Sequence, residues 1–316
     1  MSRRLVVAAA LAALAVAAAA AAAPLWVYAT TLALFGLPHV LVELRYVDER
    51  FSGRLPRGTL RWLVCGLGAV ALLRVLAFAG VGGPLVRAEL ALGVGLVAVA
   101  TPLVFSQASV AGAAAALAVS SGLLVGVIHA PLESLVSMAL LHNLTPVGFL
   151  AERLRGPARR QALVAAAAAF LLVPAVILCA PLAPAVASGP TGTGELSQHL
   201  AAFVPSPWIG TAVGERLFAA AAYLQVLHYV VVLGVLPRLG GGALAERAAA
   251  PWPRRRRFVV GVLLLGALAS ASFAGDFFGA RAGYAIFAAV HAWLEVPILV
   301  VALALGRTPE PAPSPT

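Results

Sequence analysis

The feature that most constrains this chain is a series of apolar blocks that are nearly free of charge. A helix needs about 20 apolar residues to cross a bilayer. Composition agrees, since 62% of the 316 residues are hydrophobic and only 11% are charged, whereas soluble domains average about 45–50% and about 25%. We therefore predict an all-α, polytopic transmembrane bundle of about 8–10 helices. Ten blocks run over residues 5–23, 25–44, 59–80, 85–105, 109–128, 131–150, 161–183, 212–236, 258–275 and 282–305.

Two pairs of neighbouring blocks leave the span count open. Pro24 alone separates the first block from the second, and His129-Ala130-Pro131 separates the fifth from the sixth. Proline lacks the backbone N–H and clashes with the preceding turn, so it ends or kinks a helix. Each pair is therefore either two helices or one long, kinked or re-entrant segment.

Arginine is distributed unevenly between the connecting segments. All 22 basic residues are Arg, and with ten spans 18 of them fall on one side. Cytoplasmic loops carry the positive excess in membrane proteins, so we predict that both termini are cytoplasmic, in a bacterial-type inner membrane. The run Arg254–Arg257 adjoins an apolar block and is interpreted as a topology signal that touches anionic lipid. The net charge of +10 therefore predicts no nucleic-acid partner.

We predict a single integral membrane domain over residues 1–306 and a disordered, proline-rich tail over 307–316. Residues 1–23 resemble a signal peptide, but the apolar run is longer than a usual signal core and Pro24 disfavours cleavage. We interpret them as a retained, signal-anchor-like first helix. The loop 184–211 is rich in Gly, Pro and Ser and is predicted to be a flexible connection, with His199 solvated.

Ionisable side chains inside apolar spans are costly and are functional candidates by default. Three histidines are each followed by Glu four residues later, although the chain has only ten Glu. Positions i and i+4 lie on one face of a helix, so the carboxylate can share a metal with the imidazole or fix its tautomer. The candidates are His39, Glu43, His129, Glu133, His142, His228, His291 and Glu295.

Four of these histidines share a similar predicted depth, on four different blocks, and are expected to converge on one centre: His39, His142, His228 and His291. His129 and Glu133 join this set if 109–150 forms a re-entrant segment, whereas His129 lies near the outer surface if 109–150 forms two spans. Imidazoles with a few carboxylates suit iron, copper or zinc rather than calcium or magnesium. The alternative is that each polar residue, Tyr229 and Gln225 included, makes an ordinary interhelical hydrogen bond.

One motif resembles a known family. The segment Phe35-Gly36-Leu37-Pro38-His39-Val40-Leu41-Val42-Glu43 is similar to the Gly-x-Pro-His-Gly-x-x-Asp motif of the Brp/Blh family, bacterial membrane enzymes that cleave β-carotene to retinal with O₂. Val40 stands where the motif has its second Gly, and Glu43 stands where it has Asp. The segments around His228 and His291 look loosely like the later histidine helices of that family. The resemblance covers under a tenth of the chain and implies iron held by histidines in a helical bundle.

The leading hypothesis is a membrane oxygenase that uses a metal, Fe(II) first among the choices, O₂ and a lipophilic substrate such as a carotenoid or isoprenoid. The four histidines would be ligands, and Glu43, Glu295 and Tyr229 would be catalytic or orienting groups. Copper and zinc are alternative metals. Two other functions stay open: a haem-binding electron-transfer subunit with axial histidines, and a proton or metal-ion transporter in which His/Glu pairs form a relay.

Overall fold

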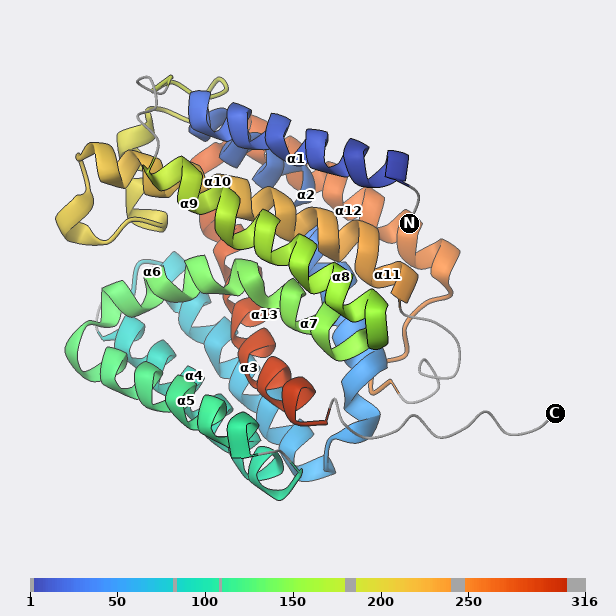
Figure 1. The fold of residues 1–316 in the computed structure, drawn as a ribbon. Helices are drawn as coiled ribbons and strands as arrows, with labels where there is room; N and C mark the ends of the chain where they lie inside the picture. Colours follow the sequence, from blue (N-terminus) through green and yellow to red (C-terminus); the bar gives the residue numbers. More distant parts are fainter. Residues whose placement is uncertain (1–2, 82–83, 108–109, 180–185, 240–247, 306–316) are drawn as a thin grey trace.

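The computed structural model describes residues 3–81, 84–107, 110–179, 186–239 and 248–305, and it is a bundle of helices (Figure 1). Among these residues the one β feature is an isolated antiparallel bridge between Ser188 and Glu195. The all-α class is therefore confirmed. Seven helices of the described chain are long and apolar enough to cross a membrane: Pro24–Arg54, Arg57–Phe78, Pro131–Arg153, Gly156–Cys179, Ala212–Leu239, Arg255–Gly275 and Phe277–Val301.

Each apolar block of the sequence corresponds to one helical rod, and three of the rods contain an irregular turn. The 3₁₀ turn His142–Leu144 and the π-helical turns Ala168–Leu172 and Val231–Val235 interrupt these rods. The helices are α1 Arg3–Ala22, α2 Pro24–Phe51, α3 Arg57–Phe78, α4 Leu85–Gln107, α5 Val110–His129, α6 Pro131–Leu141, α7 Thr145–Arg153, α8 Gly156–Ala167, α9 Val173–Cys179, α10 Ala212–Val230, α11 Leu236–Leu239, α12 Arg255–Gly275 and α13 Phe277–Leu305.

Both pairs of closely spaced blocks form separate helices. Ala23 and Ala130 leave the helical conformation, with φ of −142° and −148°, because a residue before proline is driven out of the α region. Pro24 and Pro131 then open the next helix, where the fixed proline φ is favourable. At Ala130 the chain turns back on itself, so α5 and α6 lie side by side (Figure 1).

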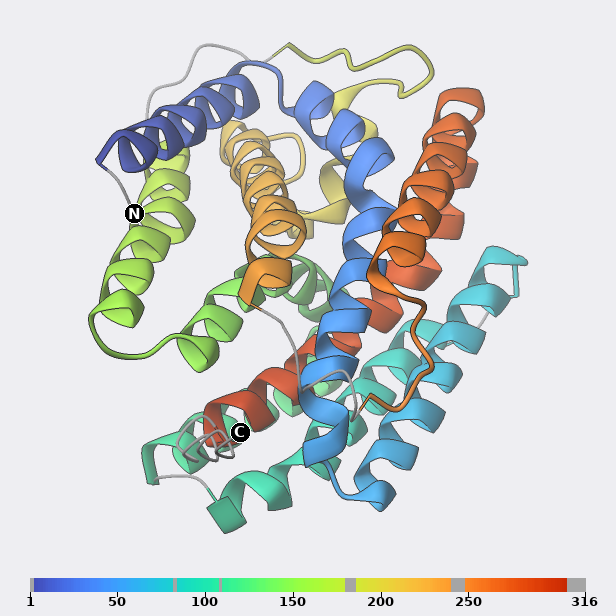
Figure 2. The same cartoon turned by 90° about the vertical axis from the view of Figure 1, so that its right-hand side faces the viewer.

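Helix α13 is central to the bundle. It packs against α2 and α12 on one side and against α3 and α4 on the other, as Figure 2 shows for the red helix and its blue and cyan neighbours. Helix α2 also contacts α10. Close approach depends on small residues, since a Cβ at Gly93 of α4 would overlap the Trp293 ring of α13. The interior between α2, α10 and α13 is where the polar residues meet.

The C-terminal ends of α2, α7 and α11 and the described residues 248–254 before α12 lie together at one end of the bundle. Arg50 of α2 pairs with Glu152 of α7 at 2.6 Å, and Arg153 donates to the Leu239 carbonyl at 2.7 Å. Asp48 accepts hydrogen bonds from the Trp252 indole and from the backbone of the segment before α12. These contacts bring the described ends of α2, α7 and α11 together, while the placement of 18 arginines on one side of a membrane stays a prediction.

At the opposite end, residues 186–211 form a folded cap, so the prediction of a flexible connection is wrong for the described part of 184–211. Leu196, Leu200 and Phe203 are buried in a cluster with Tyr28 and Phe218. The apolar residues between the Gly- and Pro-rich stretches supply this core, and burial outweighs the local preference for irregular backbone. Residues 180–185 and the predicted tail 307–316 lie outside the described residues.

Candidate metal centre

His39 is placed by the proline motif of α2. It is 1% exposed, and its Nδ1 lies 3.0 Å from the carbonyl oxygen of Phe35, one turn earlier. A carbonyl can only accept, so Nδ1 carries the proton and Nε2 keeps its lone pair for a ligand. Gly36 lets Tyr284 approach, since a Cβ there would lie 3.2 Å from the Tyr284 ring. The Gly-x-Pro-His pattern therefore combines tight packing with a set imidazole tautomer.

Two further histidines meet His39 from other helices. His228 comes from the last turn of α10, just before the π-helical turn, and His291 comes from the middle of α13. The His39 ring centroid lies 5.2 Å from that of His228 and 5.0 Å from that of His291, and the latter two are 5.7 Å apart. All three side chains are buried, and one ring nitrogen of each lies within 4.8 Å of the others.

Two carboxylates complete the cluster. Glu43 Oε2 lies 3.5 Å from His228 Nε2 and 3.7 Å from His291 Nε2, and Glu295 Oε1 lies 3.7 Å from the same His291 nitrogen. The Thr145 hydroxyl lies 2.7 Å from Glu295 Oε1 and 2.6 Å from the His142 carbonyl oxygen, so it shares its one proton between these acceptors and orients that carboxylate. Glu43, His228, His291 and Glu295 offer ligand atoms within 4.8 Å of one another. We call the five residues His39, Glu43, His228, His291 and Glu295 the His/Glu centre.

The polar atoms of this centre are buried and mostly lack hydrogen-bond partners. Both oxygens of Glu43 and both ring nitrogens of His228 and His291 are without one, as is Glu295 Oε2. Buried polar groups in proteins are normally hydrogen-bonded, because desolvation without compensation costs about 1–3 kcal/mol or more per group. A cation held by these atoms would remove that cost. The donor set of imidazole and carboxylate therefore fits a transition-metal ion.

The remaining predicted candidates lie at different distances from this centre. The His142 ring centroid is 5.4 Å from that of His228 and 6.1 Å from that of His291, so His142 borders the centre without belonging to either close group of ligand atoms. His129 is exposed at the end of α5. Glu133 lines the neighbouring cavity and also lies outside both groups. The structure does not bring these last two residues into the centre.

Two polar neighbours on α10 have different surroundings. Tyr229 is buried, and its ring centroid lies 4.2 Å from that of His39. Gln225 donates to the Thr31 hydroxyl at 2.9 Å and to the Tyr28 carbonyl at 3.2 Å. Gln225 is therefore an ordinary interhelical hydrogen-bonding residue, whereas Tyr229 packs directly on a candidate ligand.

Sequence reasoning missed a second polar contact beside the centre. Glu89 of α4 is 4% exposed; it pairs with Arg74 at 2.6 Å and accepts a hydrogen bond from the Trp293 indole at 3.0 Å. The signal was present, since Glu89 is a carboxylate inside the apolar block 85–105. Thr145 was missed for another reason, because nothing in the sequence indicates that it faces Glu295.

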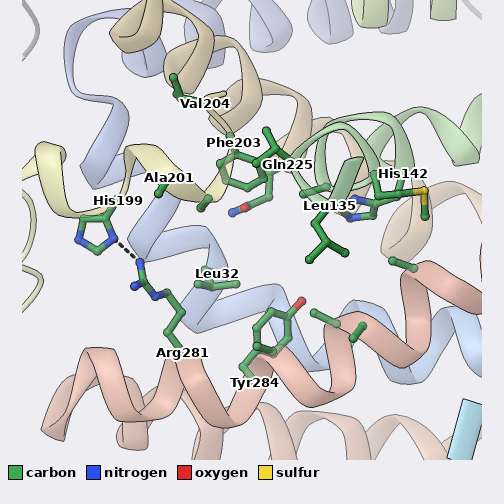
Figure 3. Close-up of a pocket in the computed structure, with 18 of the residues that line it drawn as sticks. Leu32, Leu135, His142, His199, Ala201, Phe203, Val204, Gln225, Arg281 and Tyr284 are labelled. Atoms are coloured by element: carbon green, nitrogen blue, oxygen red, sulfur yellow. Dashed lines mark hydrogen bonds between the residues drawn. The ribbon is translucent and has the colours of Figure 1, made fainter. Parts of the chain in front are cut away.

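A cavity of about 640 Å³ adjoins the His/Glu centre. It is lined at one end by His142, His291 and Tyr229 and at the other by His199 and Arg281. Figure 3 shows His142 on one side of this space and the Arg281–His199 pair on the opposite side. Its walls are otherwise largely apolar. Pockets of about 300–1,000 Å³ with a few convergent polar groups are typical of small-molecule sites.

The prediction that His199 is solvated is wrong. Its side chain is fully buried, and its Nε2 lies 2.7 Å from the Thr193 carbonyl oxygen. Nδ1 therefore carries the lone pair, and it accepts a hydrogen bond from Arg281 at 2.7 Å. Burial, assisted by the nearby Arg281 charge, lowers the pKa of His199 below its usual 6.5 despite the opposing Thr193 carbonyl. The cap therefore holds this histidine in the neutral state.

Comparison with known proteins adds no assignment. No family model, no curated protein and no solved structure matches the chain.

Proposed function

We propose that this protein is a metal-dependent membrane oxygenase that acts on a lipophilic substrate. The observation that carries the proposal is the set of buried, unpartnered imidazole and carboxylate atoms contributed by α2, α10 and α13. Such a set is costly inside an apolar bundle unless a cation binds to it. Fe(II) is the proposed metal, in keeping with the donor set and with the motif around His39.

The residues of the centre have distinct proposed roles. His39, through Nε2, and His228 and His291 would hold the metal, with Glu43 and Glu295 as further ligands or as orienters of the imidazoles. Thr145 positions Glu295 through its 2.7 Å hydrogen bond. When bound, a ferrous ion with an open coordination position supplies the binding site for O₂. His142, which borders the centre, is the proposed fourth histidine.

The cavity supplies the substrate side of the proposal. Its largely apolar walls come from α6, α13 and the cap, and it reaches the centre at His142 and His291. Tyr229 also lines it and packs on His39, so its hydroxyl is the proposed hydrogen-bond donor toward a bound oxygen-containing group. Cleavage of one C=C bond by one O₂ leaves one oxygen atom on each carbon, so the reaction balances without an external reductant.

Two features favour this proposal over the other functions. A haem with two axial histidines needs a flat slot between their rings, but the Glu43 carboxylate lies within 3.7 Å of both His228 and His291. A transporter relay would spread its ionisable groups across the membrane, whereas these five side chains meet at one point. The grouping therefore supports a single bound ion.

The test is metal analysis of the full chain purified in detergent. We expect iron close to one per chain in the wild type and background iron in the His39→Ala/His228→Ala double variant. The matched control is His129→Ala, which removes an exposed histidine of the same bundle and should leave iron unchanged. A folded, metal-free preparation that oxidises its substrate would sink the proposal, and a Soret absorption band would replace it with the haem function.

A further inference from the structure

The end of the cavity that lies farthest from the His/Glu centre carries a positive charge. Arg281, in the first turn and a half of α13, lines this end and is only partly exposed. Its guanidinium donates to the neutral His199 and lies 5.2 Å above the Phe278 ring. None of the ion pairs among the described residues includes Arg281. The charge is therefore held in place by contacts that leave it uncompensated.

The carboxylates that line the cavity, Glu89 and Glu133, form no ion pair with Arg281 within the described residues. Glu89 is paired with Arg74 and with the Trp293 indole. Glu133 lies on α6 and forms no ion pair within the part of the chain that the structure describes. Arginine cannot be deprotonated in proteins, and a partly desolvated guanidinium is stabilised by an anion that can accept two of its N–H groups. An anionic ligand group would supply that partner.

Small residues connect the charged end to the centre. The cavity wall on α13 contains alanines at three- and four-residue spacings, which place them on one face of the helix: Ala282, Ala285, Ala288, Ala289 and Ala292. Arg281 and His291 are ten residues apart on this helix, which corresponds to about 15 Å along its axis. An extended apolar chain can therefore lie on the alanine face, with one end at Arg281 and its other end beside His291.

We infer that the substrate is an anionic amphiphile, whose acidic head binds Arg281 and whose apolar chain follows the alanine face of α13 to the His/Glu centre. This inference rests on the proposed function for the chemistry at the far end, although the binding mode does not depend on it. A neutral hydrocarbon would leave Arg281 without a counter-charge. The acid is a carboxylate or a phosphate, since both accept the guanidinium fork in the same way.

The test measures binding of radiolabelled palmitate to the full chain in a neutral detergent, with hexadecanol and hexadecyl phosphate as competitors. Arg281→Gln should weaken palmitate binding by about 10- to 100-fold, because one charge-assisted contact is lost, and should leave hexadecanol competition unchanged. Arg281→Lys should keep most of the affinity because it keeps the charge. The control Arg87→Gln removes an exposed arginine that does not line the cavity, and it should have no effect.

A second variant tests the proposed binding site of the apolar chain instead of that of the acidic head group. Ala288→Phe fills the alanine face between Arg281 and His291, so it should weaken palmitate binding while octanoate, a shorter chain, binds as before. Stronger competition by hexadecyl phosphate than by palmitate, or the reverse, supports an anionic head and identifies which acid it is. Equal wild-type affinity for palmitate and hexadecanol, or unchanged palmitate binding in Arg281→Gln, would overturn the inference.

Iron is measured on the same samples, so the two proposals can fail separately. Iron bound by the wild type without discrimination between palmitate and hexadecanol overturns the anionic substrate and leaves the metal centre standing. Palmitate binding that depends on Arg281 in a protein that holds no metal supports the anionic ligand and overturns the proposed oxygenase function.

Discussion

Two buried polar clusters in this bundle differ in how many of their carboxylate oxygens accept hydrogen bonds from the protein. At the arginine-rich end, both oxygens of Glu152 are bonded by Arg50, at 2.6 and 3.3 Å. In the His/Glu centre, both oxygens of Glu43 lack a hydrogen-bond partner although that side chain is equally buried, at 1% exposure. The first carboxylate is occupied by the fold, so its role is structural. The second has no such partner and is the proposed metal ligand.

This difference predicts that removal of the two carboxylates has different effects, because Glu152 neutralises the buried Arg50 and Glu43 is proposed to bind a metal cation. Loss of the Glu152 carboxylate should lower the free energy of unfolding. Loss of the Glu43 carboxylate should lower the affinity for the metal.

The largest effect is expected for Glu152→Ala. This substitution leaves Arg50, which is 7% exposed, as an uncompensated buried charge, and breaking a buried pair in this way costs about 3–5 kcal/mol of unfolding free energy. The matched control is Glu49→Ala, which removes a partly exposed i,i+4 pair with Arg45 worth under about 1 kcal/mol. Unfolding followed by circular dichroism in detergent measures both. Equal destabilisation by the two variants would contradict the structural role of Glu152.

Glu43→Gln should act on the metal instead. We expect metal affinity to fall by about 100-fold, at the upper end of the effects seen around metal sites, because the charged oxygen nearest to both His228 and His291 is lost. The metal-free protein should be no less stable than the wild type, since Glu43 has only the long contacts of 3.5 and 3.7 Å with His228 and His291 to lose and one buried charge disappears. Metal titration and unfolding of the same sample check both halves. A strong loss of metal-free stability would place Glu43 with Glu152 as a structural residue.

A smaller effect is expected when Glu295 loses its orienting partner. Thr145→Val keeps the side-chain shape but removes the hydroxyl that donates to Glu295, so metal affinity should fall by about 10-fold. Thr31→Val is the control, since it removes a hydroxyl that bonds Gln225 in the same bundle away from the metal ligands. Metal affinities from competition with a chelator compare the two. If both variants bind metal like the wild type, Glu295 is not oriented through Thr145.

The smallest effect concerns the cap and its pH dependence. The pKa of His199 is lowered in the folded state by burial and by Arg281, so the unfolded chain binds the proton more readily. Stability contributed by neutral His199 is therefore full above about pH 6.5 and is lost as pH falls from there toward the folded pKa. His199→Gln should flatten the unfolding midpoint across that window relative to the wild type. Parallel curves for both proteins would show that His199 does not titrate on unfolding.

Much of the architecture could be predicted because it depends on local properties. The length and spacing of the apolar blocks predict one helical rod each, and Pro24 and Pro131 predict the breaks at Ala23 and Ala130. The i,i+4 His/Glu pairs place a carboxylate beside an imidazole on one helix face, and two of the three pairs meet in the centre. The third pair, His129 and Glu133, straddles the break at Ala130, so the helical spacing does not apply there.

What the chain alone determined is therefore an all-helical protein, with apolar helices long enough to cross a membrane and a few costly ionisable groups inside them, because helix length and hydropathy are summed residue by residue. Only the tertiary structure decided which of those groups share a point in space. It paired Glu89 with Trp293, turned Thr145 toward Glu295, buried His199 within the folded segment 186–211 and left both oxygens of Glu43 without a hydrogen bond. These outcomes depend on how helices distant in sequence pack and rotate against one another, and no local pattern specifies that.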